Sequence, residues 1–466
     1  MHWQFLPFQH RPFGFTHDKG TQLKRRHFIE AAGAAAVANA AGFPALAQST
    51  LPYALKANKP FAGKTVNVLL PPASQFRAQE KRLAEFEKLT GIKVVYSYVP
   101  YGQLLDKITT EAVAGNGAYD VIAYQDSWLA ALSGYFEPID AMVKADALDL
   151  ARYPQVFSAA AIYAGRNYGL PVRAHPQLFF YRKDLYAQAG ASVPSTWQEM
   201  LASAKLVQDK TGVSGVAMDY VKGSGFQNLW LWFNCLWGHG SDLLDASGKP
   251  RFNDAGGVLA TQAYVDVLTK HKVANPGSTQ FNEYDMVNSM AQGGSASMMV
   301  WWWTYSVLTG ERSKLKADQV GFAPMVRFGD GKSPTVAVVM PFGISKQSRQ
   351  KEAAWEFLKW VTNPELEVAI VTDKSDAATA DIVATNLSTL ASAKVNQANF
   401  GLPAVALKSL EGARSLPKLV VWPQVASVLE TAISEIVSSG KPVKATLDDA
   451  ARQVERITQR SGGRRG

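Results

Sequence analysis

The alternation of strand-like and helix-like segments near residues 65–124 limits the fold of this chain more than any other feature. Three short β-rich runs occur there, at Thr65–Leu70, Lys93–Val99 and Asp120–Tyr124. Between the first two runs, Arg77–Thr90 has the apolar spacing of an amphipathic helix. Strands that alternate with helices predict βαβ units and a mostly parallel sheet flanked by helices, which is an α/β fold. Ligands of such sheets bind beyond the carboxyl ends of the strands, where the loops begin at Ser74, Tyr101 and Gln125.

The segment Gly293–Tyr305 contains three consecutive tryptophans, Trp301, Trp302 and Trp303, after a short apolar run. Side chains alternate across a strand and diverge around a loop, so the three indoles cannot all point into one core. At least one is therefore expected on an accessible wall, where its apolar face and its N–H suit a flat ligand such as a sugar ring. The alternative is that all three pack in a core or an interface.

The length of 466 residues exceeds what one ordinary core accommodates, so we expect two domains or lobes. The composition, with 47% hydrophobic and 19% charged residues, is that of a globular protein. No apolar stretch reaches the roughly 18–20 residues that span a bilayer. The net charge is +9, but the basic residues are spread along the chain apart from a Gly-rich tail with Arg460, Arg464 and Arg465. This distribution does not predict nucleic-acid binding.

Cysteine and histidine usage argues against metal chemistry. Cys235 is the single cysteine, which rules out an intrachain disulfide and any multi-cysteine metal site. Beyond the N-terminal segment only His175, His239 and His271 remain, far apart in the sequence. We therefore expect no metal site and no cofactor.

The N-terminal segment has the three parts of an export signal. Arg25 and Arg26 precede a weakly apolar, alanine-rich run, which ends at Ala45-Leu46-Ala47 in the form of an A-x-A cleavage site. The paired arginines make residues 1–47 resemble a twin-arginine signal, which addresses a protein for export without anchoring it. We expect cleavage near Ala47 and a periplasmic location.

Five segments together resemble the extracellular solute-binding protein family 1, the carbohydrate-type periplasmic receptors of ABC importers. They occur in the family's order and extend over about residues 64–454: FEKLTGIKVVYSYVPYGQLLDKI, GAYDVIAYQDSW, YGLPVRAHPQLFFYRKDLY, VPSTWQEMLASAKLV and PFGISKQSRQKEAAWEFLKWVTNPE.

The resemblance implies two α/β lobes, each with a mostly parallel sheet, joined by a hinge of several crossings and closing around a ligand. We expect one lobe to comprise 63–170 plus 335–410 and the other 173–332 plus 412–459, with a flexible tail at 460–466. The crossings are expected near residues 168–173, 332–336 and 408–414.

The resemblance also nominates ligand-binding residues. In the family, the loop after the third strand contributes polar groups, here Gln125 and Asp126. A carboxylate such as Asp126 accepts strong hydrogen bonds from two neighbouring hydroxyls, although it can instead cap a helix. The family's cleft segments support Trp301, Trp302 and Trp303 and add Trp230 and Trp232. Further candidates, each with a structural alternative, are Ser74, Gln75, Tyr101 and Trp422.

Arg173 and His175 follow the first expected crossing, where family members often have acidic or small polar residues. An arginine there can bind a carboxylate or phosphate in a bidentate manner, or it can form a salt bridge between the lobes.

The function expected from these features is a non-enzymatic receptor for a sugar, oligosaccharide or polyol, monomeric, with ABC permease subunits as partners. The first alternative is a receptor for a phosphorylated or acidic polyol that binds through Arg173. An exported glycoside hydrolase is the second, since it needs only two suitably spaced carboxylates.

Overall fold

The computed structural model describes residues 50–328, 331, 333–373 and 383–461. The expected export signal of residues 1–47 lies outside the described residues, and so does residue 462 onward of the expected tail. Within the described part of the chain, no helix combines the length and the apolar character needed to cross a membrane.

The three strands predicted near residues 65–124 run in parallel, as their alternation with helices predicts. Strand β3 (Thr65–Leu70) lies between β4 (Lys93–Tyr98) and β5 (Val121–Ala123) and pairs in parallel with both. Helix α3 (Tyr101–Ala114) connects β4 to β5. This part of the sheet is a βαβ arrangement with its carboxyl ends on one edge.

The single helix predicted for Arg77–Thr90 is wrong. The chain forms α1 (Ser74–Glu80) and α2 (Leu83–Thr90) instead. Arg82 between them has φ −106° and ψ 0°, so the helical hydrogen-bond ladder is interrupted there. Gly91 ends α2 in the left-handed conformation expected of a C-terminal glycine.

The expectation of a mostly parallel sheet does not hold for the rest of the sheet. The long strand β8 (Leu170–Arg182) pairs antiparallel with β9 (Ser297–Trp301), β10 (Val320–Pro324) and β11 (Thr335–Ile344). Strand β11 also pairs antiparallel with β5, so the strand order is β10-β8-β11-β5-β3-β4. Strands β8 and β11 are both long, and they run in opposite directions beside each other. They therefore pair antiparallel.

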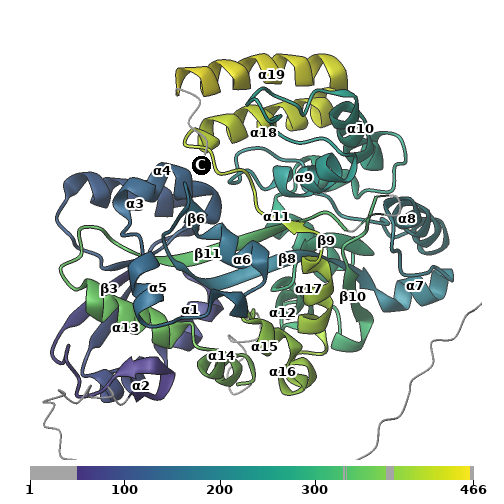
Figure 1. The fold of residues 1–466 in the computed structure, drawn as a ribbon. Coiled ribbons are helices and arrows are strands. Elements are labelled where there is room, and N and C mark those ends of the chain that lie inside the picture. Colours follow the sequence, from purple (N-terminus) through teal and green to yellow (C-terminus); the bar gives the residue numbers. More distant parts are fainter. Residues whose placement is uncertain (1–49, 329–330, 332, 374–382, 462–466) are drawn as a thin grey trace, which may run out of the picture. The chain divides into compact units, whose positions relative to one another are not determined.

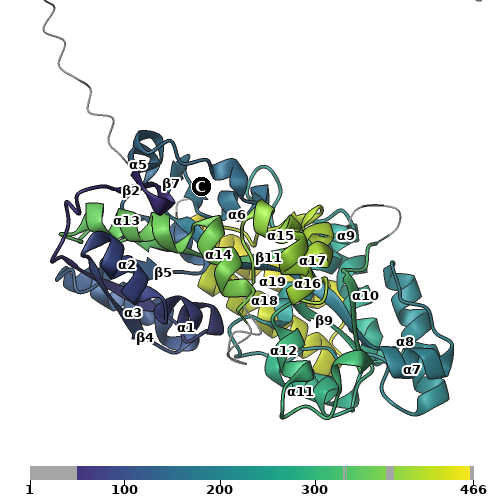
Figure 2. The same cartoon turned by 90° about the horizontal axis from the view of Figure 1, so that it is seen from below.

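The remaining elements complete the order shown in Figures 1 and 2. In Figure 2, α7 and α8 lie side by side, and α11 lies next to α12. The helices are α4 (Leu129–Leu132), α5 (Asp140–Ala145), α6 (Gln155–Ala160), α7 (Lys183–Ala189), α8 (Trp197–Thr211), α9 (Asn228–Gly238), α10 (Ala255–Thr269), α11 (Glu283–Ala291), α12 (Thr304–Thr309), α13 (Lys351–Val361), α14 (Pro364–Val371), α15 (Leu387–Ala391), α16 (Ala393–Ala398), α17 (Leu402–Leu410), α18 (Trp422–Ser439) and α19 (Val443–Arg460). The short strands are β1 (Thr50–Leu51), β2 (Leu55–Lys56), β6 (Ile162–Tyr163), β7 (Arg166–Asn167) and β12 (Ala413–Arg414).

The structure has two large hydrophobic cores, and the long strands β8 and β11 pass from one core to the other. The smaller core joins β3, β4 and β5 to α1, α2, α3, α13 and α14, and the larger core joins β9 and β10 to α7 through α12 and α17 through α19. Strand β8 contributes Leu170 and Val172 to the smaller core and Leu178 to Phe180 to the larger one. Likewise β11 contributes Val336 and Val338 to the larger core and Met340, Phe342 and Ile344 to the smaller.

The chain changes from one core to the other after α14. Val371 at the end of α14 belongs to the smaller core, whereas Val383, Leu390 and Leu402 belong to the larger one. Val395 of α16 returns to the smaller core.

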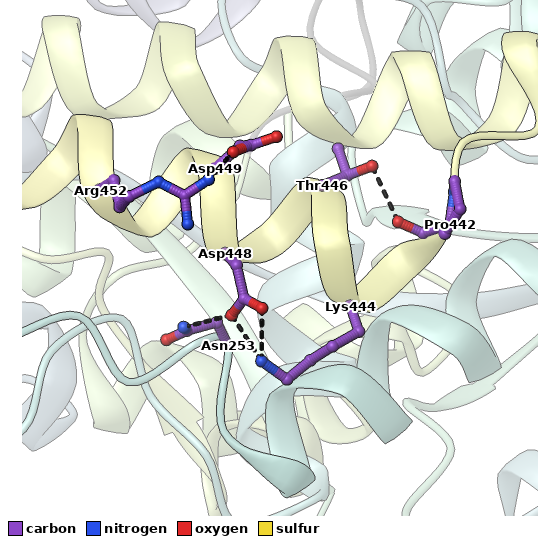
Figure 3. Close-up of polar contacts among 7 residues, drawn as sticks. All are labelled: Asn253, Pro442, Lys444, Thr446, Asp448, Asp449 and Arg452. Atoms are coloured by element: carbon purple, nitrogen blue, oxygen red, sulfur yellow. Dashed lines mark hydrogen bonds and ion pairs between the residues drawn. The ribbon is translucent and has the colours of Figure 1, made fainter.

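The C-terminal helix α19 lies beside α18 and closes the larger core over α10 (Figures 1 and 3). Its apolar face is buried, as the spacing of Leu447, Ala450 and Val454 predicts. On its polar face, the Asp448 carboxylate accepts hydrogen bonds from Lys444 Nζ at 2.6 Å and from Asn253 Nδ2 at 2.8 Å (Figure 3). The contact with Asn253 ties the helix to the segment before α10.

Candidate functional site

A cavity of about 130 Å³ lies where β8 and β11 pass between the two cores. All three loops that the sequence placed at the carboxyl ends of β3, β4 and β5 contribute to its lining. The opposite wall comes from the larger core, through the start of α9, the start of α11 and the end of β9. The lining residues are Pro71, Pro72, Ala73, Tyr101, Gln125, Arg173, His175, Gln227, Trp230, Glu283, Tyr284, Trp301, Trp303, Val338 and Met340.

Aromatic rings form one wall of this cavity. Trp230 and Trp301 meet edge to face with their ring centroids 5.1 Å apart, and His175 meets Trp301 in the same way at 5.0 Å. Trp303 lies 6.0 Å from Tyr284, whose side chain is 62% exposed although it lines the cavity. Because these rings pack against one another, their orientations are fixed, and their apolar faces suit the C–H face of a ligand.

Glu283 provides a buried carboxylate in the same wall. Its Oε2 accepts a hydrogen bond from Trp301 Nε1 at 2.6 Å, and its backbone N–H donates to Gln227 Oε1 at 3.1 Å. Burial raises the pKa of Glu283 to about 7, although the bond from Trp301 and the charge of Arg173 both lower it. The hydrogen bond from Trp301 thus fixes the position of the Glu283 carboxylate. Trp301 and Arg173 offset only part of the rise in its pKa that burial causes.

Arg173 and His175 come from β8 and form the floor between the two walls. His175 is 3% exposed, and its Nδ1 is buried without a hydrogen-bond partner. Burial and the neighbouring charge of Arg173 hold the pKa of His175 well below its usual value, so the imidazole is neutral.

The wall from the smaller core has two polar side chains, Tyr101 and Gln125, beside Pro71, Pro72 and Ala73. Tyr101 donates from its hydroxyl to Gln125 Oε1 at 2.8 Å, and its ring lies 5.5 Å from that of Trp128. Burial is the main cause that raises the pKa of the Tyr101 hydroxyl above its usual value, so it remains a hydrogen-bond donor. Gln125 is therefore oriented before any ligand arrives.

Asp126 does not line the cavity, although the sequence nominated it. The residue is 1% exposed, and its Oδ1 accepts from the backbone N–H of Ser127 at 3.0 Å, while Oδ2 has no partner. Burial raises the pKa of Asp126 to about 7, and the charge of Lys418 is the largest opposing cause. Its side chain makes no capping bond to a following helix, so the capping alternative does not match its contacts. Gln125 Nε2 donates to Asp126 Oδ1 at 3.4 Å, so the residue contacts the cavity lining from behind, and its direct contact with a ligand stays a prediction.

Five further candidates lie away from the cavity lining. Trp232 is fully buried and donates from Nε1 to Thr261 Oγ1 at 2.8 Å, while Trp302 and Trp422 are packed in the larger core. Gln75 uses its side-chain oxygen to accept from the backbone of Val383 at 3.1 Å. Ser74 opens α1 just beyond the cavity-lining Ala73. The structure thus brings together Tyr101, Gln125, Arg173, Trp230, Trp301 and Trp303 from the nominated set.

The sequence analysis did not nominate Glu283, Tyr284 or Gln227, which all line the cavity. Glu283 and Tyr284 open α11, where Asn282 and Asp285 form a capping box. An acidic residue in the first turn of a helix is ordinarily read as helix stabilisation. The neighbouring Tyr284 was the available signal, because an aromatic residue at the start of a helix can line a binding cavity.

Two solved structures define the class of this fold. The chain resembles maltose-bound MalE3 of T. maritima with a TM-score of 0.74 and 22% identity, over 84% of this chain and 99% of that chain. It resembles a solute-binding protein of Agrobacterium vitis S4 with bound D-mannitol with a TM-score of 0.71 and 22% identity, over 86% of this chain and 99% of that chain. These neighbours are two-lobed solute-binding proteins, and the expected two-lobed α/β fold is confirmed.

The family model described as bacterial extracellular solute-binding protein matches residues 72–367. The chain belongs to this family, whose members and relatives here are binding proteins rather than enzymes. A "Probable amino-acid ABC transporter periplasmic-binding protein" of Sinorhizobium fredii is 28% identical over 74% of this chain and 78% of its own length. The mannitol-binding protein of Pseudomonas aeruginosa is 26% identical over 76% of this chain and 84% of its own length.

Proposed function

We propose that this protein is the periplasmic receptor of an ABC importer and captures a sugar, oligosaccharide or polyol in the cavity between its two cores. The N-terminal segment would serve as a twin-arginine signal that is removed near Ala47, and the mature receptor would act as a monomer on the permease subunits. The ligand is delivered unchanged, since the protein acts by binding rather than by catalysis.

The observation that carries the proposal is the composition of the cavity. Trp230, Trp301 and Trp303 line it together with hydrogen-bonding groups from Gln125 and Glu283. A polyhydroxylated ligand has C–H faces that pack on indole rings and hydroxyls that need fixed donors and acceptors. Relatives that bind mannitol, and structures with bound maltose or mannitol, support this class of ligand.

The two cores would act as lobes that close on the ligand. The lobes expected from the sequence are 63–170 plus 335–410 and 173–332 plus 412–459, with β8 and β11 passing between them. Because Val383, Leu390 and Leu402 pack in the larger core, we propose that residues 383–410 belong instead with the second lobe. Hinge closure of this kind brings residues from both walls onto one ligand, so binding depends on both lobes.

A phosphorylated or acidic ligand is the second candidate, and it depends on Arg173. The guanidinium lies in the cavity lining and can bind a carboxylate or phosphate with two parallel hydrogen bonds. The name of the Sinorhizobium relative extends this candidate to amino acids.

Thermal-shift and tryptophan-fluorescence measurements with the purified protein test both candidates. The panel contains monosaccharides, disaccharides, polyols, sugar phosphates and amino acids. A ligand that binds only the folded state at a hundredfold excess over Kd stabilises it by about 2.7 kcal/mol, which a melting curve detects readily.

Trp230→Phe and Trp232→Phe form a matched pair for this test. Both residues belong to α9, but only Trp230 lines the cavity. We expect Trp230→Phe to weaken ligand binding at least tenfold and Trp232→Phe to leave the affinity within threefold. Equal effects would contradict the site, and a shift with acidic ligands alone would replace the first candidate with the second.

A further inference from the structure

His175 is a side chain of the cavity lining whose hydrogen-bonding groups no other described residue uses. It lies on β8 opposite Val338 of β11, which also lines the cavity, and it is 3% exposed. Its Nδ1 is buried without a partner, and none of the described residues forms a hydrogen bond with either nitrogen of the ring. Buried polar groups of folded proteins are nearly always hydrogen-bonded, because an unsatisfied one destabilises the fold. An unpaired imidazole in a cavity wall therefore indicates a partner that binds there.

Two other buried side chains of the lining already have partners within the protein. Gln125 Oε1 accepts from the Tyr101 hydroxyl at 2.8 Å, and Glu283 Oε2 accepts from Trp301 Nε1 at 2.6 Å. These bonds fix both side chains before a ligand binds. Of the three buried groups, only His175 keeps both its donor and its acceptor for a ligand.

The His175 ring is held by packing instead of by a hydrogen bond. It meets Trp301 edge to face, with the ring planes at 90° and the centroids 5.0 Å apart. A half turn about the Cβ–Cγ bond leaves the ring in its plane and preserves this contact, but it exchanges the positions of the nitrogens and the ring carbons. Because the turn breaks no hydrogen bond, either ring nitrogen can be presented to the cavity.

We propose that His175 binds one hydroxyl of the ligand and is a specificity-determining residue of this receptor. The inference rests on the proposed function, because it assumes that this cavity is the ligand site. A neutral imidazole has one N–H and one lone pair, and a hydroxyl can both donate and accept. A hydroxyl therefore satisfies the ring in either tautomer, whereas a carboxylate or phosphate oxygen, which only accepts, satisfies only one. The ligand class is then a neutral polyhydroxylated molecule with a hydroxyl at one fixed position.

The stability of the ligand-free protein separates this role from a structural one. Replacing His175 removes no hydrogen bond within the protein, so His175→Phe should not lower Tm. His239 is the matched control, because it lies outside the cavity lining and its Nδ1 donates to the carbonyl oxygen of Cys235 at 2.8 Å. His239→Phe should therefore lower Tm and leave the affinity for ligands within threefold.

Isothermal titration calorimetry compares the wild type with His175→Phe, which keeps a planar ring beside Trp301 but has no ring nitrogen. His175→Leu provides the test if His175→Phe fails to fold. The probes are D-mannitol, erythritol, D-glucose and maltose, and we expect each probe that the wild type binds to bind the variant at least tenfold more weakly. Affinities within threefold of the wild type, with or without a lower Tm, would overturn the proposal and leave the proposed function standing. A wild type that binds none of the four probes would contradict the proposed function as well.

Monodeoxy analogues show whether the lost affinity belongs to a single hydroxyl. The analogues derive from whichever of the four probes binds the wild type most tightly, and each lacks one hydroxyl. A site that hydrogen-bonds a hydroxyl discriminates against the analogue without it, so one analogue should bind the wild type at least tenfold more weakly than the parent. The same analogue should differ less than threefold from the parent in His175→Phe, because that variant has no nitrogen for the hydroxyl. If every analogue loses affinity by the same factor in both proteins, His175 contacts no ligand hydroxyl and the proposal is wrong.

Discussion

Replacing Asp126 with asparagine tests whether the burial of this carboxylate lowers the stability of the protein at neutral pH. Asp126 is 1% exposed, and burial raises its pKa from 3.8 to about 7. A carboxyl group whose pKa is higher in the folded than in the unfolded state favours folding only while it is protonated. Its contribution to stability is therefore greatest below the unfolded pKa near 4 and is lost as the pH rises to about 7.

The magnitude follows from the shift of about three pKa units. Each unit corresponds to about 1.36 kcal/mol, so ionisation of Asp126 lowers the free energy of unfolding by about 4 kcal/mol over the full range. Between pH 4.5 and pH 8 the linkage relation gives about 3 kcal/mol, because the unfolded carboxyl is already mostly ionised at pH 4.5. Asparagine keeps an oxygen for the Ser127 N–H but has no charge to bury.

Urea unfolding of both proteins at pH 4.5 and pH 8 measures the effect. We expect the stability of Asp126→Asn relative to the wild type to be about 3 kcal/mol more favourable at pH 8 than at pH 4.5. Glu283 and the other titrating groups are common to both proteins and cancel in this difference. Asp209→Asn is the matched control, because Asp209 is 52% exposed on α8 and should show no such change. A relative stability of Asp126→Asn that is the same at both pH values would refute the reasoning.

Three substitutions in helices test the local packing. Thr196→Ala removes the capping box of α8, in which Thr196 Oγ1 accepts from the Glu199 N–H, and should cost about 1 kcal/mol in urea unfolding. Gly257→Ala should lower Tm, because a Cβ at this buried position of α10 would lie 1.9 Å from the carbonyl oxygen of Phe252. Gly102→Ala in α3 is its counterpart, with no atom within 4 Å of the added Cβ, and should stabilise by roughly 1 kcal/mol. Calorimetry should show a lower Tm for Gly257→Ala and a higher Tm for Gly102→Ala, and Tm shifts of the same sign would contradict this packing argument.

The part of the smaller core formed by β3, β4 and β5 could be predicted from the sequence, because its strand and helix patterns arise from residues close together in the chain. The strand predicted at Thr65–Leu70 has the same bounds in the structure, and its neighbours β4 and β5 follow it closely in the sequence, after α1 and α2 and then after α3. The antiparallel direction of β8 and β11 could not be predicted, because these strands pair across more than 150 residues of intervening chain. Local periodicity carries no information about which distant strand becomes the neighbour.

The same limit explains which tryptophans line the cavity. The expectation that Trp301, Trp302 and Trp303 cannot share one core is wrong, because all three are buried in the larger core. Trp301 and Trp303 also line the cavity, whereas Trp302 does not. Strand β9 ends at Trp301, so the turn into α12 sets the directions of the next two side chains. Trp230 and Trp232 are also two residues apart, but on a helix this spacing turns the side chains by about 200°, onto different faces. The sequence analysis nominated both tryptophans because they lie in one tryptophan-rich segment. Only the packing of α9 decides which face of the helix lines the cavity.

The position of Asp126 behind the cavity leads to a prediction about Lys418, which lies between β12 and α18. Lys418 Nζ donates to the carbonyl oxygens of Ala159 at 2.5 Å and Ile162 at 2.7 Å, and its charge is the largest cause that lowers the pKa of Asp126. Lys418→Met should therefore raise the pKa of Asp126 above about 7 and extend the loss of stability to higher pH.

A double-mutant cycle isolates this interaction from the lost bonds to the two carbonyls. At pH 8, where Asp126 is mostly ionised, Lys418→Met should cost more in the wild type than in Asp126→Asn. At pH 5, where Asp126 is protonated in the folded protein, the two costs should agree within about 0.5 kcal/mol. Because the carbonyl bonds are lost in both backgrounds, only the charge of Asp126 can make the cost depend on pH in this way. A cost at pH 8 that is the same in both backgrounds would show that Lys418 acts on the carbonyls alone.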